Sequence, residues 1–345
     1  MPNSATAAPT VGVAMAGVAK ARARVAHGVM PPRPRQTDPV ESKGSPPGNG
    51  ALCAVSCLCH GVHWYKRQVH SAYAVDAPVF TFRIPMPTHA STVQPTEPFS
   101  FKVLTVNIHK GFSPLNRTFM LHDLREAVRK VAADVVFLQE VQGSHLKHAH
   151  RISNFPEAPQ YEFLADSIWQ QFAYGRNAAY DHGHHGNALL SKFPIKHMEN
   201  HNLSIAGPEK RGMLHCVLEV PGRTQPIHTL CVHLSLTDNH RRKQLALMCR
   251  MIQRDIPPDA PLLLAGDFND WRNRAHRFLA DHAGLKEVFV STHGEAARTF
   301  PARLPVLQLD RIYLRNAAVH NALALAGRPW SHLSDHAPLA ADIRL

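Results

Sequence analysis

Short apolar runs that end directly in a polar residue recur from about residue 99 to the end of the chain. Phe101–Ile108 alternates apolar and polar residues, and Leu262–Ala265 is apolar throughout; these patterns are typical of a half-buried and a fully buried strand. The same reasoning predicts strands at Asp134–Gln139, Ala188–Ser191, Leu214–Val220, Ile227–His233, Arg311–Leu314 and Leu339–Ile343. Many short strands with few helices between them favour two face-to-face sheets over a regular parallel βαβ sheet.

Three segments have the spacing of helices instead. Apolar residues three and four positions apart predict a helix from a cap at Asn116 to about Val131. Further helices are predicted at Asp238–Ile252 and Arg274–His282. We therefore expect an α/β fold in which helices cover the outer faces of two sheets.

The first 98 residues differ from this part of the chain. They carry 13 of the 27 prolines, are rich in Ala, Arg and Ser, and show no sustained apolar periodicity. Such a stretch cannot bury enough apolar surface to offset the entropy of ordering it. The sequence predicts a disordered extension at residues 1–98 and one folded domain at residues 99–345. Translation from Met86, with the upstream residues misannotated, fits the same pattern.

The net charge of +12 and the pI of 9.7 favour an anionic partner. The sign alone does not choose among nucleic acid, phospholipid and small phosphodiesters. Part of the excess lies in the predicted extension, at Lys20, Arg22, Arg24, Arg33 and Arg35. The charge therefore says less about the folded domain than its size suggests.

The cysteines give no sign of a disulfide framework. Cys216, Cys231 and Cys249 lie in apolar surroundings, where a free thiol behaves as a small hydrophobic group. A second group resembles a metal cluster but fits no familiar zinc spacing: Cys53, Cys57, Cys59, His60 and His63. The run Val11–Ala19 is too short to span a bilayer and makes a poor signal peptide. We expect a cytoplasmic protein without a transmembrane segment, with peripheral membrane association left open.

Polar residues at the ends of the predicted strands are the candidate site. They are Asn107, Glu140, His233, Asp267, Asn269, Asp310, Asp335 and His336. Strand ends can converge on one edge of a rigid sheet, which holds polar groups without burying them in the core. Glu140, with Asn107 and Asp335, offers the oxygen ligands that Mg²⁺ prefers in proteins. We therefore predict a site for Mg²⁺, or for Mn²⁺, at this edge.

The remaining members of the candidate site suit proton transfer and phosphate binding. Asp267 and Asn269 stand two residues apart and point to one side of an extended chain, although an Asx turn explains the pair equally well. Asp310 can hold the imidazole of His336 in one tautomer. His233 can donate a hydrogen bond to a phosphate oxygen.

These motifs, in this order, resemble the endonuclease/exonuclease/phosphatase superfamily. The matching stretches cover nearly all of residues 101–345: TVNIHKG (Thr105–Gly111), VVFLQEV (Val135–Val141), GNALLSKFPI (Gly186–Ile195), CVHLSL (Cys231–Leu236), LLLAGDFND (Leu262–Asp270), LDRIYL (Leu309–Leu314) and LSDHAPLAADI (Leu333–Ile343). Four more stretches are similar to an uncharacterised bacterial subgroup: YGRNA (Tyr174–Ala178), GHHGNA (Gly183–Ala188), EKRG (Glu209–Gly212) and AGDFNDW (Ala265–Trp271). The histidines of GHHGNA are a weak second metal candidate.

The resemblance implies a DNase I-like, four-layer α/β/β/α sandwich with Mg²⁺ or Mn²⁺. Carried over by position, it implies that Glu140 is the metal ligand and that Asn107 and Asp335 help to hold metal or phosphate. It also implies that Asp267 and Asn269 orient the attacking water, that Asp310 and His336 are the acid–imidazole pair, and that His233 contacts phosphate; it leaves the general base open between Asp267 and His336. We further assign Arg176 and Asn187 to substrate binding. Abasic-site endonucleases have an acidic residue where this chain has His109, which disfavours that activity.

The sequence therefore predicts a divalent-metal-dependent phosphoester hydrolase that acts by in-line attack of water. A phosphodiesterase for a lipid or small molecule is favoured, because aromatic residues for base stacking make up only 7% of the chain. The alternatives are a DNA or RNA nuclease and, third, a non-catalytic module that binds a phosphate ligand. The substrate and the oligomeric state do not follow from the sequence.

Overall fold

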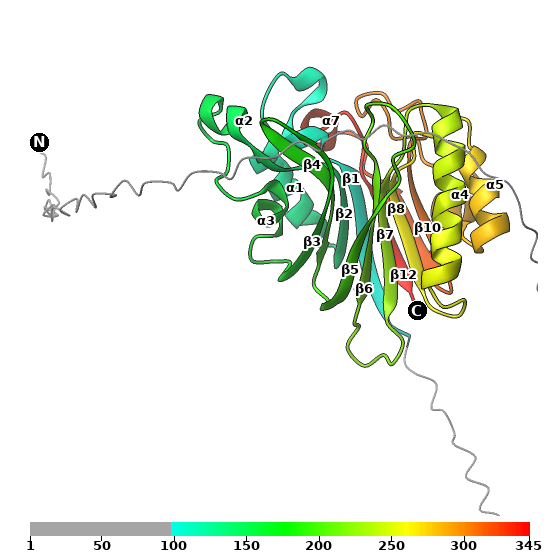
Figure 1. Cartoon of the computed structure of the whole chain (residues 1–345). Helices are drawn as coiled ribbons and strands as arrows, with labels where there is room; N and C mark the ends of the chain where they lie inside the picture. Colours follow the sequence, from blue (N-terminus) through cyan, green and yellow to red (C-terminus); the bar gives the residue numbers. More distant parts are fainter. Residues whose placement is uncertain (1–97) are drawn as a thin grey trace, which may run out of the picture. The chain divides into compact units, whose positions relative to one another are not determined.

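The computed structural model describes residues 98–345, which form two six-stranded sheets with helices on both outer sides (Figure 1). The predicted extension, the alternative start at Met86, and the cysteine–histidine group at residues 53–63 lie outside the described residues. Among residues 98–345, none of the helices has the length and apolar character needed to cross a bilayer.

The first sheet has the strand order β11-β12-β1-β2-β4-β3. Its strands are β1 (Ser100–Asn107), β2 (Val135–His145), β3 (Gln171–Tyr180), β4 (Gly183–Ser191), β11 (Ala318–Ala324) and β12 (Leu339–Arg344). The central pair, β1 and β2, is parallel, and all the other neighbours are antiparallel.

The second sheet has the order β5-β6-β7-β8-β10-β9. Its strands are β5 (Ile195–Asn202), β6 (Gly212–Leu218), β7 (Ile227–His233), β8 (Leu262–Asp267), β9 (Lys286–Glu287) and β10 (Asp310–Arg315). Here the parallel pair is β7 and β8. Each sheet therefore has two central strands whose carboxyl ends lie at the same edge. Parallel strands cannot be joined by a tight turn, and in each sheet a helix connects the two.

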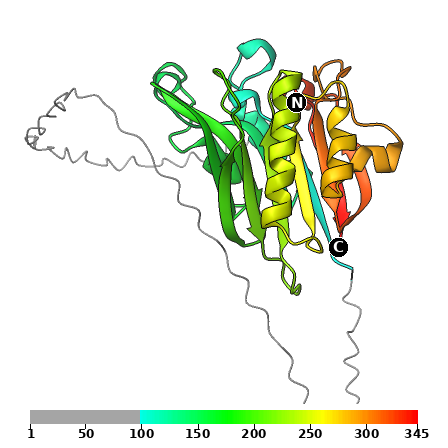
Figure 2. The same ribbon diagram turned by 45° about the vertical axis from the view of Figure 1, so that its right-hand side comes forward.

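Helices lie against the outer face of each sheet, as the two views in Figures 1 and 2 show. The helices are α1 (Leu121–Val131), α2 (Leu146–Arg151), α3 (Gln160–Ala165), α4 (Asp238–Asp255), α5 (Arg274–Ala283), α6 (Val288–His293) and α7 (Trp330–Leu333), with one-turn 3-10 helices at His109–Gly111 and Pro114–Asn116. Three apolar cores separate the layers: one between the sheets, one under α1 and α3, and one under α4 and α5. This confirms the four-layer α/β/β/α sandwich.

The first helix begins later than the sequence predicted. It starts at Leu121, after Met120, and not at Asn116. Asn116 has a φ of 54° and ends a separate 3-10 turn, and the backbone N–H of Ser113 donates to the carbonyl of Thr118 at 2.8 Å. The segment therefore folds back on itself before the helix begins, a turn that spacing alone does not reveal.

The second strand is longer than predicted and contains a bulge. It runs to His145, and its pairing with β4 shifts register between Leu138 and Val141. Within that shift Glu140 has a φ of 56°. A bulge re-aims the side chains beside it, so this carboxylate leaves the ordinary alternation of the strand.

Candidate active site

Strand register brings three of the predicted site residues into one row across the second sheet. His233 at the end of β7 pairs with Asp267 at the end of β8, and Asp267 pairs with Asp310 at the start of β10. All three are buried. Because β10 is antiparallel to β8, its first residue lies at the same edge as the last residues of β7 and β8.

The backbone around Asp267 is shaped to hold this carboxylate in place. Gly266 has a φ of +144°, and a Cβ there would stand 2.0 Å from the carbonyl oxygen of Val232, so only glycine lets β8 approach β7 this closely. Beyond the strand, the N–H of Asn269 donates to Oδ1 of Asp267 at 2.9 Å, as in an Asx turn. The amide of Asn269 donates to the carbonyl of Leu234 at 3.0 Å. The two residues thus form the Asx turn that the sequence left open as an alternative, and both also line the site.

The first sheet supplies the groups that face this row. Nδ2 of Asn107, at the end of β1, donates to Oδ2 of Asp267 at 3.1 Å and to Oε1 of Glu140 at 3.4 Å. Its Oδ1 accepts from the N–H of His109 at 3.0 Å. In this arrangement Asn107 bridges the two carboxylates through its amide nitrogen, and a metal contact of its side-chain oxygen stays a prediction.

Oδ2 of Asp267 is the point on which the nitrogen atoms of the site converge. Besides Asn107, Nε2 of His233 lies 3.4 Å away and Nε2 of His336 lies 3.8 Å away. Burial raises the pKa of the Asp267 carboxyl above its ordinary value, although both imidazoles act in the opposite direction. Burial also lowers the pKa of His233 to about 4, so this imidazole is neutral near pH 7.

His336 and Asp310 form a short hydrogen-bonded pair. Nδ1 of His336 lies 2.8 Å from Oδ2 of Asp310, and the loop that carries His336 is tied down because Ser334 Oγ donates to the carbonyl of Asn107 at 2.7 Å. Burial alone would lower the pKa of His336, but the carboxylates of Asp310 and Asp267 outweigh it and raise the pKa to about 10. This imidazole therefore carries a positive charge at neutral pH.

Glu140 faces a cation. Its Oε2 lies 2.5 Å from Nζ of Lys110, which follows β1. Burial would raise the pKa of Glu140, but nearby His233 and Lys110 hold it well below its usual range. The carboxylate is therefore ionised at neutral pH and already has a positive charge beside it.

These groups open into a cavity of about 360 Å³ at the edge of the two sheets. It is lined by Glu140, Arg211, His233, Leu236, Asp267, Asn269, Trp271, Phe300, Leu307, Leu309, Asp335 and His336. The half-buried Asp335 lies with its Oδ2 3.8 Å from Nε2 of His109. Three acidic groups, three cationic or imidazole groups and an apolar wall thus share one opening.

Of the residues predicted to bind substrate or phosphate, His233 lines this cavity, whereas Asn107, Arg176 and Asn187 do not. Arg176 is exposed on β3. Asn187 is buried, and its Nδ2 donates to the carbonyls of Gly212 at 3.1 Å and Cys231 at 3.2 Å, so it joins β4 to the second sheet. In this structure Asn187 holds the two sheets together, and its contact with substrate stays a prediction.

The weak second metal candidate, at Gly183–Gly186, does not form a convergent ligand set. Nδ1 of His184 lies 2.9 Å from the hydroxyl of Tyr174. Within residues 98–345, one group of at least three acidic or histidine side chains brings its ligand atoms within 4.8 Å of one another, and it consists of Asp267, Asp310 and His336.

Sequence reasoning missed several residues of the cavity. Lys110 lies beside Glu140, outside the lining, in the motif that follows β1, and Arg211 lies on the wall in the EKRG stretch; neither motif predicts the role of its cation. Nε of Arg211 is buried without a hydrogen-bond partner. Trp271 and Phe300 come from loops whose sequences carry no signal for a cavity wall.

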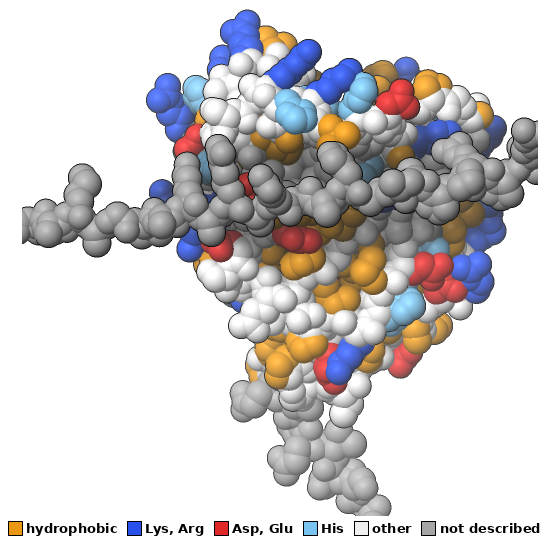
Figure 3. All heavy atoms as spheres, turned by 60° about the vertical axis from the view of Figure 1, so that its left-hand side comes forward, with side chains coloured by type: hydrophobic (Ala, Val, Ile, Leu, Met, Phe, Trp, Pro, Cys, Tyr) orange, Lys and Arg blue, Asp and Glu red, His pale blue; other side chains and the backbone are white. Residues whose placement is uncertain are grey.

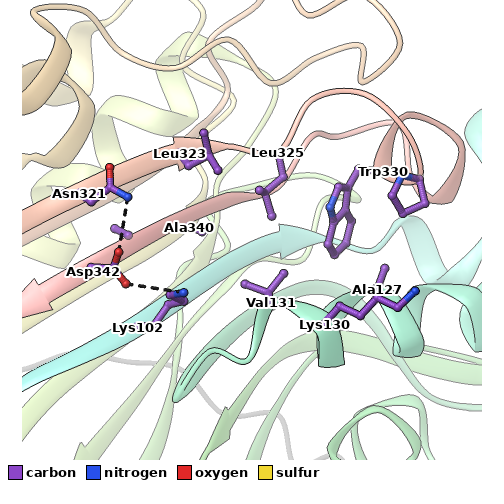
Figure 4. A pocket seen from close by; sticks show the side chains of 12 residues that line it. Lys102, Ala127, Lys130, Val131, Asn321, Leu323, Leu325, Trp330, Ala340 and Asp342 are labelled. Carbon is purple, nitrogen blue, oxygen red and sulfur yellow. Dashed lines mark hydrogen bonds and ion pairs between the residues drawn. The ribbon is translucent and has the colours of Figure 1, made fainter.

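A second hollow, of about 380 Å³, lies on the outer side of the first sheet (Figure 4). Trp330, Leu323 and Leu325 line it from one side and Val131 of α1 from the other, with a Lys102–Asp342 ion pair at one end. None of the predicted site residues lines it. It is a gap beside α7 where the helices leave β11 and β12 partly uncovered.

The fold and the site define a DNase I-like α/β sandwich with a carboxylate–imidazole centre where its central strands end. The chain belongs to the endonuclease/exonuclease/phosphatase family, whose model matches residues 104–336. Members of this family are generally metal-dependent phosphoesterases, among them nucleases and phosphatases.

Similar proteins agree with this assignment. The uncharacterized protein YbhP of Escherichia coli K12 is 54% identical over 250 residues, which are 72% of this chain and 98% of that protein. Among solved structures, an endonuclease/exonuclease/phosphatase from Bacteroides vulgatus aligns with a TM-score of 0.57 at 18% identity, over 72% of this chain and 99% of that one. D. rerio TDP2, complexed with a single-strand DNA product, aligns with a TM-score of 0.52 at 18% identity, over 71% and 98%.

Proposed function

We propose that this protein is a divalent-metal-dependent phosphodiesterase that hydrolyses a lipid or small-molecule phosphoester. The observation that carries the proposal is the convergence of Asn107, His233 and His336 on one carboxylate oxygen of Asp267 at the wall of the cavity. Such a set holds one group that can accept a proton next to several that can stabilise negative charge, which is what water attack on a phosphoester requires.

Asp267 is the general base in this proposal. Its carboxyl has a raised pKa, closer to neutrality, whereas His336 already holds its proton. Asp267 takes a proton from a water molecule as the water oxygen bonds to phosphorus, and the bond from phosphorus to the ester oxygen breaks on the opposite side. The ester oxygen leaves with the bonding electron pair and takes a proton from solvent. Asn269 fixes the orientation of the Asp267 carboxylate through its backbone N–H.

The charge that develops on the phosphoryl oxygens meets fixed donors. His336 is an imidazolium held by Asp310, and His233 is a neutral imidazole that can donate one hydrogen bond. The guanidinium group of Arg211, which pairs with Glu209 through Nη2 and leaves its buried Nε without a partner, is a further cation on the same wall. Preorganised donors of this kind need no rearrangement as the reaction proceeds.

The donor set fits a hard divalent cation. Glu140 and Asp335 place carboxylates on the cavity wall, and the ammonium group of Lys110 already stands beside Glu140 as a cation would. These two carboxylates would hold Mg²⁺ or Mn²⁺, with the oxygens of Asp267 nearby. The ion, when bound, would neutralise charge on the phosphoester oxygens.

A nuclease is the second candidate, and one observation favours it. Trp271 is 51% exposed on the cavity wall, with the guanidinium group of Arg272 4.4 Å above its ring. An exposed indole can stack on a nucleic acid base. The other aromatic residue of the wall, Phe300, packs its ring against the imidazole of His336, and the remaining apolar residues are leucines, so base stacking has few partners here.

The test is hydrolysis of bis(p-nitrophenyl) phosphate, phospholipids and plasmid DNA by the purified chain in Mg²⁺ and in Mn²⁺. Glu140→Gln and His336→Ala should each lower the diesterase rate about a thousandfold or more. Glu126→Gln and His320→Ala change exposed residues away from the cavity and should leave the rate intact. Equal turnover by wild type and the two site variants, at unchanged melting temperatures, would refute the proposal.

A further inference from the structure

Exposed hydrophobic side chains gather around the mouth of the candidate cavity. Six of the eleven large hydrophobic side chains that are exposed within residues 98–345 lie on the loops there: Leu115, Leu236, Trp271, Leu304, Val306 and Leu307. Single exposed apolar residues are ordinary on a protein surface. A group of them around one opening marks a surface that contacts a partner.

Three of these residues, Leu304, Val306 and Leu307, belong to a hairpin that is packed against the site. Phe300 and Leu307 pair across it, with a backbone hydrogen bond of 2.8 Å from Leu307 to Phe300. The ring of Phe300 packs against the imidazole of His336, with the centroids 5.1 Å apart. Near the tip, Leu304 is 73% exposed and Val306 is 56% exposed. The apolar tip is therefore fixed relative to the catalytic groups.

A hollow of about 500 Å³ lies on the other side of this hairpin. Leu115 and Arg117 line it opposite Arg303, and it shares Phe300 and Asp335 with the candidate cavity. The two hollows thus have a common wall, and the exposed apolar groups surround both.

Arginine side chains lie on the same loops as these exposed hydrophobic residues. Arg117, Arg272 and Arg303 are exposed on these loops and make no ion pair within residues 98–345. Figure 3 shows Lys and Arg side chains along the upper edge of the domain, the edge at which β1 ends in Figure 1, with hydrophobic side chains among them. A surface with apolar tips among unpaired cations is complementary to anionic lipid headgroups over an acyl layer.

We propose that this edge docks on an anionic phospholipid bilayer, so that the substrate phosphoester is taken from the membrane surface. The docking edge consists of Leu115, Arg117, Trp271, Arg303, Leu304 and Val306. The inference rests on the proposed phosphodiesterase function and names its substrate class. Aliphatic tips favour a bilayer over nucleic acid, because Leu and Val gain free energy in an acyl layer and offer a base nothing to stack on.

The test is sedimentation of the full chain with vesicles of phosphatidylcholine alone and of phosphatidylcholine mixed with phosphatidylglycerol. Binding should require phosphatidylglycerol, and Leu304→Ser with Val306→Ser should weaken it about tenfold or more. The matched control is Met198→Ser with Leu323→Ser, which are 45% and 56% exposed elsewhere, Leu323 beside the hollow of Figure 4. The control should bind as wild type does, and all three proteins should hydrolyse the soluble diester at one rate.

The possible results separate the two proposals. Vesicle binding that survives the Leu304 and Val306 changes, or that falls equally in the control, overturns the docking edge. Failure to bind vesicles, with tip-dependent binding of an oligonucleotide or tip-dependent self-association instead, also overturns it. No turnover of the soluble diester by wild type speaks against the phosphodiesterase alone, because vesicle binding is measured without hydrolysis.

Discussion

At the scale of single residues, one oxygen atom organises the candidate site. Oδ2 of Asp267 has an amide and two imidazoles around it, each from a different segment of the chain. Four of the ten non-glycine residues with positive φ in the described part of the chain, residues 98–345, lie here, namely His109, Lys110, Glu140 and Asn269. Such backbone costs free energy and persists where the surrounding structure imposes it.

Asp310 should act through His336. Asp310→Asn keeps a hydrogen-bonding side chain but removes the charge that holds the imidazolium, so we expect kcat to fall about a hundredfold with little change in KM. The pKa of His336, followed by NMR in EDTA, should fall toward its ordinary value. Asp342→Asn, which changes an ion pair on β12, is the control. An unaltered His336 pKa in Asp310→Asn would contradict the positioning role.

Arg211 should bind the phosphoester. Its Nε is buried on the cavity wall with no partner, and a charge-assisted hydrogen bond contributes enough that Arg211→Ala should raise KM about ten- to a hundredfold. Michaelis constants for a soluble diester measure this effect. Arg277→Ala removes a side chain that is 91% exposed on α5 and should change nothing. A fall in kcat at constant KM would assign Arg211 to a different step.

The residues that the sequence identified are those whose position follows from a strand end. To predict His233, Asp267 and Asp310 as site residues, it was enough to locate the ends of three apolar runs. Asn187 also lies on a buried strand, β4, but its side chain points between the sheets. There its amide donates hydrogen bonds to two backbone carbonyls. Which face a polar residue takes depends on the partner sheet, and a single strand's sequence does not contain that information.

At the scale of secondary-structure elements, the sequence predicted all eight inner strands of the two sheets and missed all four edge strands. The missed strands are β3, β5, β9 and β11, the outermost strands of the two sheets. An inner strand is covered on both faces and shows an apolar run, whereas β5 is mostly exposed and reads as a polar segment. Edge strands are defined by their neighbours, so local pattern finds them poorly.

A histidine cluster on β5, β6 and β7 should make the fold sensitive to acid. Nε2 of His215 lies 3.0 Å from Nδ1 of His228, and burial, reinforced by the neighbouring imidazoles, lowers the pKa of His215 from 6.5 to about 4. Between these values the unfolded chain binds more protons than the folded protein does. The free energy of unfolding should therefore decrease as pH falls from about 6.5 to about 4, by roughly 3 kcal/mol for one such group.

Urea unfolding over this pH range checks the expectation. His215→Gln removes the group that cannot take a proton in the folded state, so its unfolding free energy should depend less on pH than that of wild type. His320→Gln changes an exposed histidine on β11 and should follow wild type. If His215→Gln and wild type lose stability in parallel, the acid sensitivity comes from other groups.

At the scale of the whole domain, the site is built from both sheets. Asn107 and Glu140 come from the first sheet, whereas His233, Asp267 and Asp310 come from the second. The bond from Asn107 to Asp267 crosses between them. The sequence predicted two sheets and a common site, but not which strands belong to which sheet, because strand order depends on contacts between distant segments.

A cation bound between these walls should stabilise the domain as a whole. An ion that binds the folded protein and not the unfolded chain adds about 3 kcal/mol when its free concentration is about a hundred times its dissociation constant. Adding Mg²⁺ or Mn²⁺ to EDTA-treated protein should therefore raise Tm by several degrees.

Glu140→Gln should keep its Tm in EDTA and lose most of this rise, whereas Glu126→Gln, on the exposed face of α1, should show the full rise. Calorimetry with no substrate present measures the shift. An equal rise in Glu140→Gln would place the cation away from this carboxylate, and no rise in wild type would remove the metal from the proposed reaction.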